Sequence, residues 1–592
     1  MDSIPPGVHY LIQRAHKLTA PPLLTYFAFR YYLAPTYGVQ YPALHSAWTL
    51  ACALIGSLPS TLALAVLWSE VRIRVDAARK GAIMPPRLGD WSPGNIMTVI
   101  KNIREFEKKY PGDGFDQLCK QHGCSTFNAR VLFENRLITA EPDIIKAILA
   151  TQFDEFEKGP ETRTLFYPLL GTGVFAADGD LWKFHRSMTR PFFSRERISH
   201  FDNFDRHAED AITQLKSRLR EGHPVDFQDL VARFTLDSAT EFLFGNDVGS
   251  LSGGLPYPYY IKSGVANTDV VPHLSSRFVG ALAEAQMITA RRMGLGVHWP
   301  LMEFWHDKLK GPMRVVHEFI DPIVAEAISR KRASVGHVRE KDDETLLENL
   351  VNSTEDPITL RDEIMSLLVA GRDTTASTLT FIVYMLAEHP KVLQRLREEV
   401  LERVGPQRRP TYDDFRDMKY LRAVINETLR LYPAVPFNIR TSKEATVWPN
   451  KHGKPFYVPA NTRTPYAIAL MQRREDLWGP DALEFDPDRF LDERLHKYLT
   501  PNPFIFLPFN AGPRICLGQQ FAYHETSFFL VRLLQSFSGI LLAPDAQPPK
   551  SRPPAEWAAE GENMRKRREK IKPKAHLTMY VQGGLWVTMQ EA

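Results

Sequence analysis

Most of the chain places apolar residues at the three- and four-residue spacing of amphipathic helices, and few stretches alternate as strands do. The clearest helical patterns cover about Thr359 to Ala387, Lys419 to the residue before Pro433, and Gln519 to Leu534. Pro357 introduces the first of these. We therefore predict a mainly α-helical body, with small β-sheets at its periphery.

Strand patterns are confined to two short regions. Val131 to Phe133 and Leu137 to Thr139 lie on either side of Glu134-Asn135. Leu577 to Val581 and Leu585 to Met589 lie on either side of Gly583-Gly584, a pair that favours a tight hairpin turn. Each region is predicted to form a β-hairpin.

One uncharged, mostly apolar run, Ala47 to Trp68, is long enough to cross a bilayer as a helix. Pro59 is expected to kink it, with Ser57 and Ser60 available for the freed backbone groups. The run starts too far from Met1 for a cleavable signal peptide. The alternative is a buried core helix, and we favour the transmembrane interpretation.

The flanking charges suggest an orientation. More basic residues follow the run (Arg72, Arg74, Arg79, Lys80 and Arg87) than precede it (Arg14, Lys17 and Arg30). The positive-inside rule therefore places the large C-terminal part in the cytosol. Pro21 to Leu33 is shorter and holds Arg30, so residues 1–46 are expected to form an interfacial or re-entrant segment.

Residues 69–90 form a basic, proline-containing hinge in this scheme, because Pro85-Pro86 cannot continue a helix. No Gly/Ser-rich stretch divides the 592-residue chain further along, so residues 91–592 are predicted to be one catalytic domain. A net charge of +4 is too small to suggest nucleic acid as a partner.

The four cysteines, Cys52, Cys119, Cys124 and Cys516, do not form the pattern of a secreted disulfide framework, which favours a reducing compartment. Cys119 and Cys124 have only His122 near them and no second ligand pair, so free thiols are expected there rather than zinc ligands.

Cys516 stands in a loop with an unusual composition, Phe509-Asn-Ala-Gly-Pro-Arg-Ile-Cys-Leu-Gly518, directly before a predicted helix. Gly512 and Gly518 would let the backbone pass close to a flat cofactor. The N-terminus of the following helix would favour thiolate over thiol. The loop is therefore predicted to present a thiolate ligand to a metal; the alternative is a buried, inert cysteine in a tight turn.

The spacing Phe-x-x-Gly-x-Arg-x-Cys-x-Gly resembles the cysteine loop of the cytochrome P450 haem-thiolate enzymes. The resemblance implies the P450 fold, haem b as cofactor and Cys516 as the axial ligand of its iron, with Phe509, Gly512 and Arg514 around the cofactor.

Other motifs follow in the order of that family. Trp182 and Arg186 are four residues apart and share a helix face, where both can donate hydrogen bonds to a carboxylate. By resemblance this carboxylate is a haem propionate, and Arg440 matches a second propionate arginine.

Within the central helix, Ala370 and Gly371 leave room beside a ligand, and Asp373 and Thr374 are costly in mid-helix, where a local opening is expected. In the family motif the threonine stabilises iron-bound oxygen and the acid helps to deliver protons, so we assign these roles to Thr374 and Asp373. The alternative is an ordinary exposed polar face.

Glu427 and Arg430 lie three apart on one helix, and Arg489 supplies the third member of the buried charge triad that the resemblance implies. The role of this triad is structural. Ala370, Ala434, Val435 and Phe437 are expected to line the substrate pocket above the haem.

A thiolate ligand favours O–O cleavage, which implies monooxygenation. Because the sequence has no Gly-x-Gly-x-x-Gly fingerprint, electrons must come from NADPH through a separate diflavin reductase, with cytochrome b5 as a second candidate donor. The resemblance points to the endoplasmic reticulum membrane and to fungal alkane and fatty-acid hydroxylases, some of whose relatives take xenobiotics. A haem-thiolate isomerase or dehydratase and a non-catalytic haem sensor are the alternatives, and the Asp373–Thr374 pair argues against both.

One strongly basic run, Met564 to Lys574, is not part of any of these motifs. It could bind an anionic membrane or an acidic partner, and we favour a solvated, partly disordered loop.

Overall fold

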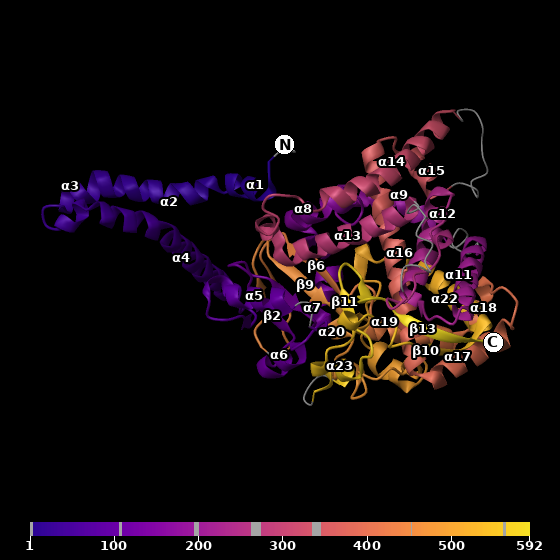
Figure 1. Cartoon of the computed structure of the whole chain (residues 1–592). Helices are drawn as coiled ribbons and strands as arrows, with labels where there is room; N and C mark the ends of the chain where they lie inside the picture. The colour runs from indigo at the N-terminus through magenta and orange to yellow at the C-terminus, as the bar shows by residue number, and fades with distance from the viewer. Residues whose placement is uncertain are drawn as a thin grey trace.

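The computed structural model describes residues 4–105, 109–194, 201–261, 274–333, 345–451, 453–559 and 564–592. A helical body carries a long helical arm at its N-terminus, and the C-terminus lies on the body (Figure 1). The arm consists of α1 (Pro6–Gln13), α2 (Ala15–Ala28), the π-helical turn η1 (Phe29–Leu33), α3 (Ala34–Tyr37), the 3-10 turn η2 (Pro42–His45) and α4 (Ala47–Arg79).

The helices of the body are α5 (Ile96–Glu105), α6 (Phe115–His122), α7 (Pro142–Lys146), α8 (Gly159–Leu170), α9 (Gly179–Thr189), α11 (Asp202–Arg220), α12 (Phe227–Phe244), α13 (Leu274–Leu295), α14 (Lys310–Ala333), α15 (Leu346–Ser353), α16 (Pro357–Glu388), α17 (Pro390–Arg403), α18 (Tyr412–Asp417), α19 (Lys419–Leu431), α20 (Ile468–Met471), α21 (Glu475–Trp478), α22 (Gln519–Ser536) and α23 (Met564–Arg568). The prediction of a mainly α-helical body with small sheets is confirmed.

The strands are β1 (Arg87–Leu88), β2 (Thr126–Ala129), β3 (Leu137–Thr139), β4 (Phe156–Glu157), β5 (Val225–Asp226), β6 (Phe437–Ser442), β7 (Thr446–Trp448), β8 (Phe456–Val458), β9 (Arg463–Ala467), β10 (Phe537–Leu542), β11 (Pro573–Ala575), β12 (Met579–Val581) and β13 (Trp586–Glu591). They form sheets in the orders β1-β2-β3-β9-β6-β4, β10-β13-β5, β11-β12 and β7-β8.

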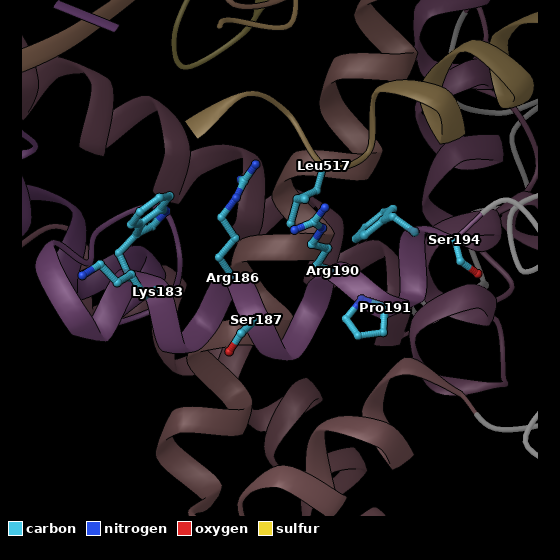
Figure 2. Close-up of a pocket in the computed structure, with 9 residues that line it drawn as sticks. Lys183, Arg186, Ser187, Arg190, Pro191, Ser194 and Leu517 are labelled. Carbon is cyan, nitrogen blue, oxygen red and sulfur yellow. The ribbon is translucent and has the colours of Figure 1, made fainter. Parts of the chain in front are cut away.

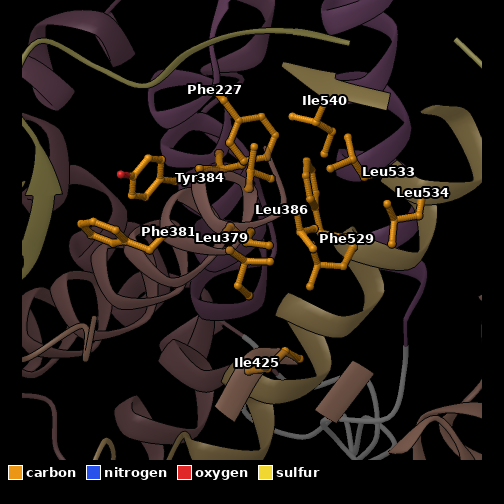
Figure 3. Close-up of a cluster of buried hydrophobic side chains, with 14 of the residues drawn as sticks. Phe227, Leu379, Phe381, Tyr384, Leu386, Ile425, Phe529, Leu533, Leu534 and Ile540 are labelled. Atoms are coloured by element: carbon orange, nitrogen blue, oxygen red, sulfur yellow. The ribbon is translucent and has the colours of Figure 1, made fainter. Parts of the chain in front are cut away.

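Helix α16 runs through the centre of the body and packs against α12, α19 and α22. Pro357 occupies its first turn, and the Asp356 carboxylate caps it by accepting a hydrogen bond from the Thr359 N–H at 2.9 Å. Its C-terminal half is buried almost completely: Leu379 and Leu386 share one apolar cluster with side chains of α12 and α22, such as Phe227 and Phe529 (Figure 3). The Phe381 ring stacks on Tyr432, with 4.5 Å between centroids. This core fixes α16 relative to α22, the helix that follows the cysteine loop.

The first predicted hairpin has a different register. Strand β2 pairs antiparallel with β3 from Thr126 to Asn128, so the first strand lies before Val131 to Phe133. Leu132 and Phe133 have φ values of 46° and 75°, in the left-handed region, and belong to the turn. The apolar side chains at these positions suggested a strand, but their backbone cannot continue one.

The second predicted hairpin is wrong. Strand β12 pairs with β11, and β13 pairs with β10 and β5, so Gly583-Gly584 connects two different sheets. Both glycines have positive φ, and a Cβ at Gly584 would lie 2.0 Å from an Asp226 carboxylate oxygen. The tight turn at Gly583-Gly584 is present, but β12 and β13 pair with other strands and not with each other.

The apolar run is one long helix, because α4 continues for eleven residues beyond Trp68 to Arg79. Pro59 lies inside it, and the Ser57 hydroxyl donates to the Leu54 carbonyl oxygen at 2.7 Å. Within the described residues, α4 is the helix whose length and mean hydropathy suit a membrane span. The segment 69–90, expected to be a hinge, is therefore helical in its first half.

The body holds the C-terminal part of α4. Ala77 is buried in a small cluster with Ala82 and Tyr457, and Ile73 packs against this cluster. Glu70 forms an ion pair with Arg130 beyond β2. The chain then joins the large sheet through β1, directly after Pro85-Pro86.

The expectation of a solvated loop at Met564 to Lys574 is wrong. Arg565, Lys566 and Glu569 are buried. The Glu569 carboxylate accepts hydrogen bonds from three tyrosine hydroxyls at 2.6 to 3.0 Å, those of Tyr110, Tyr384 and Tyr432. The Arg565 guanidinium donates to the Tyr432 hydroxyl oxygen at 2.8 Å. The run thus closes a buried polar network between distant segments, which its composition alone could not show.

Candidate functional site

The cysteine loop, Phe509 to Gly518, contains the 3-10 turn η13 (Gly512–Arg514) and leads directly into α22. The Cys516 N–H donates to the Phe509 carbonyl oxygen at 3.0 Å, which closes the loop. Asn510 has a φ of 64°, and its side-chain oxygen accepts a hydrogen bond from the Tyr466 hydroxyl at 3.1 Å. The Phe509 ring packs on Tyr523 of α22, with 5.0 Å between centroids. These contacts hold the loop in a single conformation.

The backbone conformation and the packing at Gly512 both require glycine. Its φ is 71°, and a Cβ there would lie 1.9 Å from the Leu149 carbonyl oxygen. Gly518 has an ordinary φ of −82°, and a Cβ there would meet the Phe193 ring at 3.5 Å, a normal contact. The structure shows that Gly512 closely approaches a backbone oxygen, and its expected clearance for a flat cofactor remains a prediction.

Gly512→Ala is therefore expected to displace the loop and to reduce haem retention sharply, because left-handed strain of about 1–3 kcal/mol adds to a clash with rigid backbone. Gly518→Ala is the matched control and should retain haem. The haem-to-protein absorbance ratio of the two purified variants measures this. Equal retention would show that the Leu149 contact does not position the loop.

The Cys516 side chain is exposed, and among the described residues it forms no disulfide. Burial raises the pKa of the Cys516 thiol, while the Gly518 backbone N–H and the Arg186 charge lower it. Without a bound metal, the loss of solvation raises the thiol pKa more than the start of α22 lowers it. A metal cation at the sulfur would reverse this balance.

Three cations gather beside the loop. Burial and the charges of Arg440 and Arg514 lower the pKa of Lys158 well below its usual value. Burial and Arg440 also lower the pKa of Arg514 to about 10. Asp178 opposes both shifts and forms an ion pair with Arg514 at 2.9 Å. Asp178 offsets the charges of Lys158 and Arg514, and Arg440 adds a further buried positive charge, an arrangement that suits another anionic group.

This arrangement fits haem. Two propionates would neutralise the cations Lys158, Arg440 and Arg514, and the accessible sulfur of Cys516 would serve as iron ligand. Lys158 was not found from the sequence, because a single lysine outside any motif gives no signal there. Only the fold brings it to Arg440 and Arg514.

Trp182 and Arg186 share one face of α9 as predicted, but they contact different groups. The Arg514 guanidinium lies 4.6 Å from the centroid of the Trp182 ring. The Arg186 guanidinium donates to the Ile515 carbonyl oxygen at 3.0 Å. Both residues line an open cleft of about 700 Å³ between α9 and the cysteine loop, where Arg186 and Arg190 extend toward Leu517 (Figure 2). A shared propionate contact for Trp182 and Arg186 remains a prediction.

On α16, Asp373 lies among polar partners. Its carboxylate oxygens accept hydrogen bonds from Arg372 at 2.7 Å and from the Gln286 amide of α13 at 2.5 Å. The Thr374 hydroxyl donates to the Ala370 carbonyl oxygen at 2.7 Å, and α16 is continuous through this point. The expected opening of the helix is absent from α16. A Cβ at Gly371 would meet only Ala239, at 4.0 Å, so space does exist beside the pair.

A second acid near Thr374 was also missed. Glu525 of α22 is buried, accepts a hydrogen bond from the Ser238 hydroxyl at 2.8 Å and interacts with Thr375 of α16. Burial raises the pKa of Glu525 to about 8, so the carboxyl holds a proton at neutral pH, at the side of α16 where Thr375 lies. Glu525 follows Cys516 on a helix with weak patterning, and nothing in the sequence marks it.

The stability of the protein is expected to depend on Glu525 protonation. The folded protein binds one more proton than the unfolded chain between the ordinary pKa of 4.5 and the raised value of about 8. The free energy of unfolding should therefore fall as pH rises through this window and level off above it. Glu525→Gln should lose this contribution and exposed Glu493→Gln should keep it, as urea unfolding across the window would measure. An identical pH slope in all three proteins would contradict the shift.

The structure brings Glu427, Arg430 and Arg489 together with fully buried side chains. Arg430 binds Glu427 through two hydrogen bonds at 2.7 and 2.8 Å. The Arg489 Nε atom lies 3.6 Å from Oε1 of the same carboxylate, an oxygen that Arg430 also binds. Arg430 also donates to the carbonyl oxygens of Gln472, Ala482 and Glu484, and Arg489 donates to Asp481. The triad thus ties α19 to the segment before the cysteine loop.

The predicted pocket residues differ in exposure. Ala370 and Val435 are half-buried, Ala434 is buried, and Phe437 at the start of β6 is 40% exposed. The Ala434 carbonyl oxygen accepts a hydrogen bond from the Met579 N–H at 2.9 Å, so β12 packs behind this stretch. Their role in substrate binding remains a prediction.

A cysteine loop that leads into α22, a threonine-bearing helix packed against α22, and a rim of cations together define a haem-thiolate protein. Residues 91–560 match the sequence profile of the family described as Cytochrome P450. The chain is 36% identical over 504 residues to cytochrome P450 monooxygenase g430 of a Fusarium species, covering 82% of this chain and 85% of the relative. It is 38% identical to cytochrome P450 52E1 of Candida apicola, covering 69% and 77%, and 38% identical to cytochrome P450 52A3-B of Candida maltosa, covering 70% and 77%.

The chain belongs to the cytochrome P450 family and is a monooxygenase, as the cysteine motif predicted.

Proposed function

We propose that this monooxygenase hydroxylates fatty acids or n-alkanes at or near the chain end. The observation that carries the proposal is the exposed apolar helix α4, which suits an anchor that brings the site to a source of hydrophobic substrate. The expected pocket residues Ala370, Ala434, Val435 and Phe437 are apolar too, as such a substrate requires. The Phe509 to Phe521 segment, with its resemblance to fungal alkane and fatty-acid hydroxylases, supports the same substrate class.

Different residues of the site have different roles in this proposal. Lys158, Arg440 and Arg514 would hold the haem propionates, with Trp182 packed on Arg514. The bound haem supplies oxygen activation, which the Cys516 thiolate promotes by donating electron density. Thr374 would hold a proton at its hydroxyl, and Asp373, held by Arg372 and Gln286, would pass a proton to it.

Electrons reach the site from NADPH through a separate diflavin reductase in this proposal, with cytochrome b5 as an alternative donor. The exposed face of α9 supports this, because Lys183 and Arg190 lie beside Arg186 at the cleft next to the cysteine loop. A cationic face close to the iron ligand suits an acidic partner. We place the protein in the endoplasmic reticulum membrane through α4, with its catalytic body in the cytosol.

Reconstitution tests the proposal. The full chain in microsomes is given diflavin reductase, NADPH and either a fatty acid, an n-alkane or an alkylphenol. The expected result is NADPH consumption with hydroxylation at or next to the terminal carbon of the aliphatic substrates. Efficient turnover of the alkylphenol alone would overturn the substrate class, while leaving the monooxygenase chemistry intact.

Thr374→Ala should retain haem and still consume NADPH, but product formed per NADPH should fall by roughly tenfold, or about 1.4 kcal/mol in the productive barrier. The reason is that oxygen is activated without correct proton delivery. Thr378→Ala is the matched control, since Thr378 makes the same type of bond one turn later, to the Thr374 carbonyl oxygen at 2.8 Å. Unchanged coupling in Thr374→Ala would disprove its role.

A further inference from the structure

The N-terminal arm doubles back on itself. Helices α1 and α2 run outward from the body, α3 lies at the far end, and α4 returns (Figure 1). Helices α2 and α4 contact each other along their length. The arm is thus a helical hairpin whose two limbs are residues 6–37 and α4.

Both ends of this hairpin rest on the body. The Gly7 N–H donates to the Phe304 carbonyl oxygen at 2.9 Å, and the Tyr10 hydroxyl bonds the His298 ring nitrogen Nδ1 at 2.7 Å. A Cβ at Gly7 would lie 2.1 Å from the Phe304 ring, so the approach is close. At the other end, Glu70 of α4 pairs with Arg130. The chain therefore starts and re-enters on the same side.

The outer turn of the hairpin carries exposed aromatic side chains. Tyr31 is 71% exposed, Tyr32 61%, Tyr41 58% and Trp48 82%. Trp48 and Trp68 are twenty residues apart on α4, which separates them by about 30 Å, the thickness of the hydrocarbon core. Tyrosine and tryptophan concentrate at membrane interfaces, so the turn marks the far interface and Trp68 the near one.

The first limb resembles a membrane segment in its surface. None of the residues of α2 is buried, and Leu23, Leu24 and Phe27 are 53%, 70% and 53% exposed. No charged residue lies between Lys17 and Arg30. Exposed leucine and phenylalanine side chains in contact with water are unfavourable. If the first limb lies in the bilayer beside α4, lipid covers them.

The charges agree with a crossing. In a hairpin, Arg14 and Lys17 of the first limb join Arg72, Arg74, Arg79 and Lys80 of α4 on the side of the body, and Arg30 alone lies near the far interface, where its side chain can reach the headgroups. With a single span, Arg14 and Lys17 would lie opposite the body, and the positive-inside bias would be weaker.

We propose that residues 6–37 cross the bilayer as a second limb antiparallel to α4, so that the N-terminus lies on the same side as the catalytic body. The proposal rests on the membrane anchoring of α4. It replaces an interfacial or re-entrant N-terminal segment with a two-limb anchor whose partner is the lipid bilayer and whose base docks on the body at Gly7 and Tyr10.

Thiol labelling in sealed microsomes tests the proposal. The full chain carries serine in place of Cys52, Cys119 and Cys124, retains Cys516, and receives one new cysteine. The new cysteine is Gln13→Cys at the base of the first limb, Val39→Cys in the outer turn, where Val39 is 97% exposed, or Ser252→Cys on the body as a control. A membrane-impermeant maleimide is added before or after permeabilisation, and haem loading shows that each variant is folded.

The proposal expects Gln13→Cys and Ser252→Cys to label in sealed vesicles as rapidly as in detergent, and Val39→Cys to lose labelling until the membrane is permeabilised. If Gln13→Cys and Val39→Cys are both protected, α4 spans alone and the second limb is overturned. If both label in sealed vesicles, α4 does not cross, and the anchor itself fails. Protection of Gln13→Cys with labelling of Val39→Cys would overturn the orientation.

Discussion

Cys516→Ala is expected to abolish the carbon monoxide difference band of thiolate-bound haem and to reduce monooxygenase activity to background. The alanine has no sulfur to donate electron density, and the three cations beside the loop would still attract the haem propionates without fixing the iron. The carbon monoxide difference spectrum of dithionite-reduced membranes measures this result.

The control is Cys52→Ser, which removes an exposed thiol in α4 and leaves the cysteine loop intact. It should give the same band as the parent protein. A band of parent intensity in Cys516→Ala would mean that another residue ligates the iron, and the assignment of the loop would then fail together with the mechanism based on it.

Glu427→Gln is expected to have the largest effect on stability. Removing its charge leaves Arg430 buried without a counter-charge, while Arg489 keeps only its ion pair with Asp481. Breaking a buried pair costs about 3–5 kcal/mol. Burial already lowers the pKa of Arg430, and Glu427 is the main group that opposes this. A domain is typically stable by only about 5–15 kcal/mol, so much of the variant should be recovered unfolded and free of haem.

Urea unfolding of the soluble fraction measures this loss. Asp413→Asn is the matched control, since the Arg416–Asp413 pair is exposed and 3.6 Å long. Exposed pairs of this kind contribute about 0–1 kcal/mol, so the control should unfold as the parent protein does. Equal losses in both variants would show that the triad gives no more stability than a surface pair.

Local pattern was enough to predict the parts of the molecule that depend on local chemistry. The central helix was expected from Thr359 to Ala387 and extends from Pro357 to Glu388, because a proline start and a long apolar face define it without help from distant residues. The cysteine loop was identified from fixed spacing, since a turn next to a ligand permits few residue types at each position.

Features that depend on distant partners were predicted poorly. Strand β13 pairs with β10 rather than with its sequence neighbour β12. In the Met564 to Lys574 run, Arg565, Lys566 and Glu569 are buried, and three tyrosines from separate segments bind Glu569. Lys158 and Glu525 are single charged residues whose importance comes from what the fold places beside them. No spacing rule within the chain encodes such neighbours.

The continuity of α4 from Trp68 to Arg79 determines how the enzyme sits on its membrane. Eleven residues of unbroken helix form a spacer of about 16 Å, and its last turns are clamped to the body by Ala77 and Glu70. Such a spacer fixes both the distance of the body from the membrane and its rotation about the helix axis. Each residue added or removed within it would turn the body by about 100° about the helix axis, so the length of this short stretch sets which face of the enzyme is presented to the lipid.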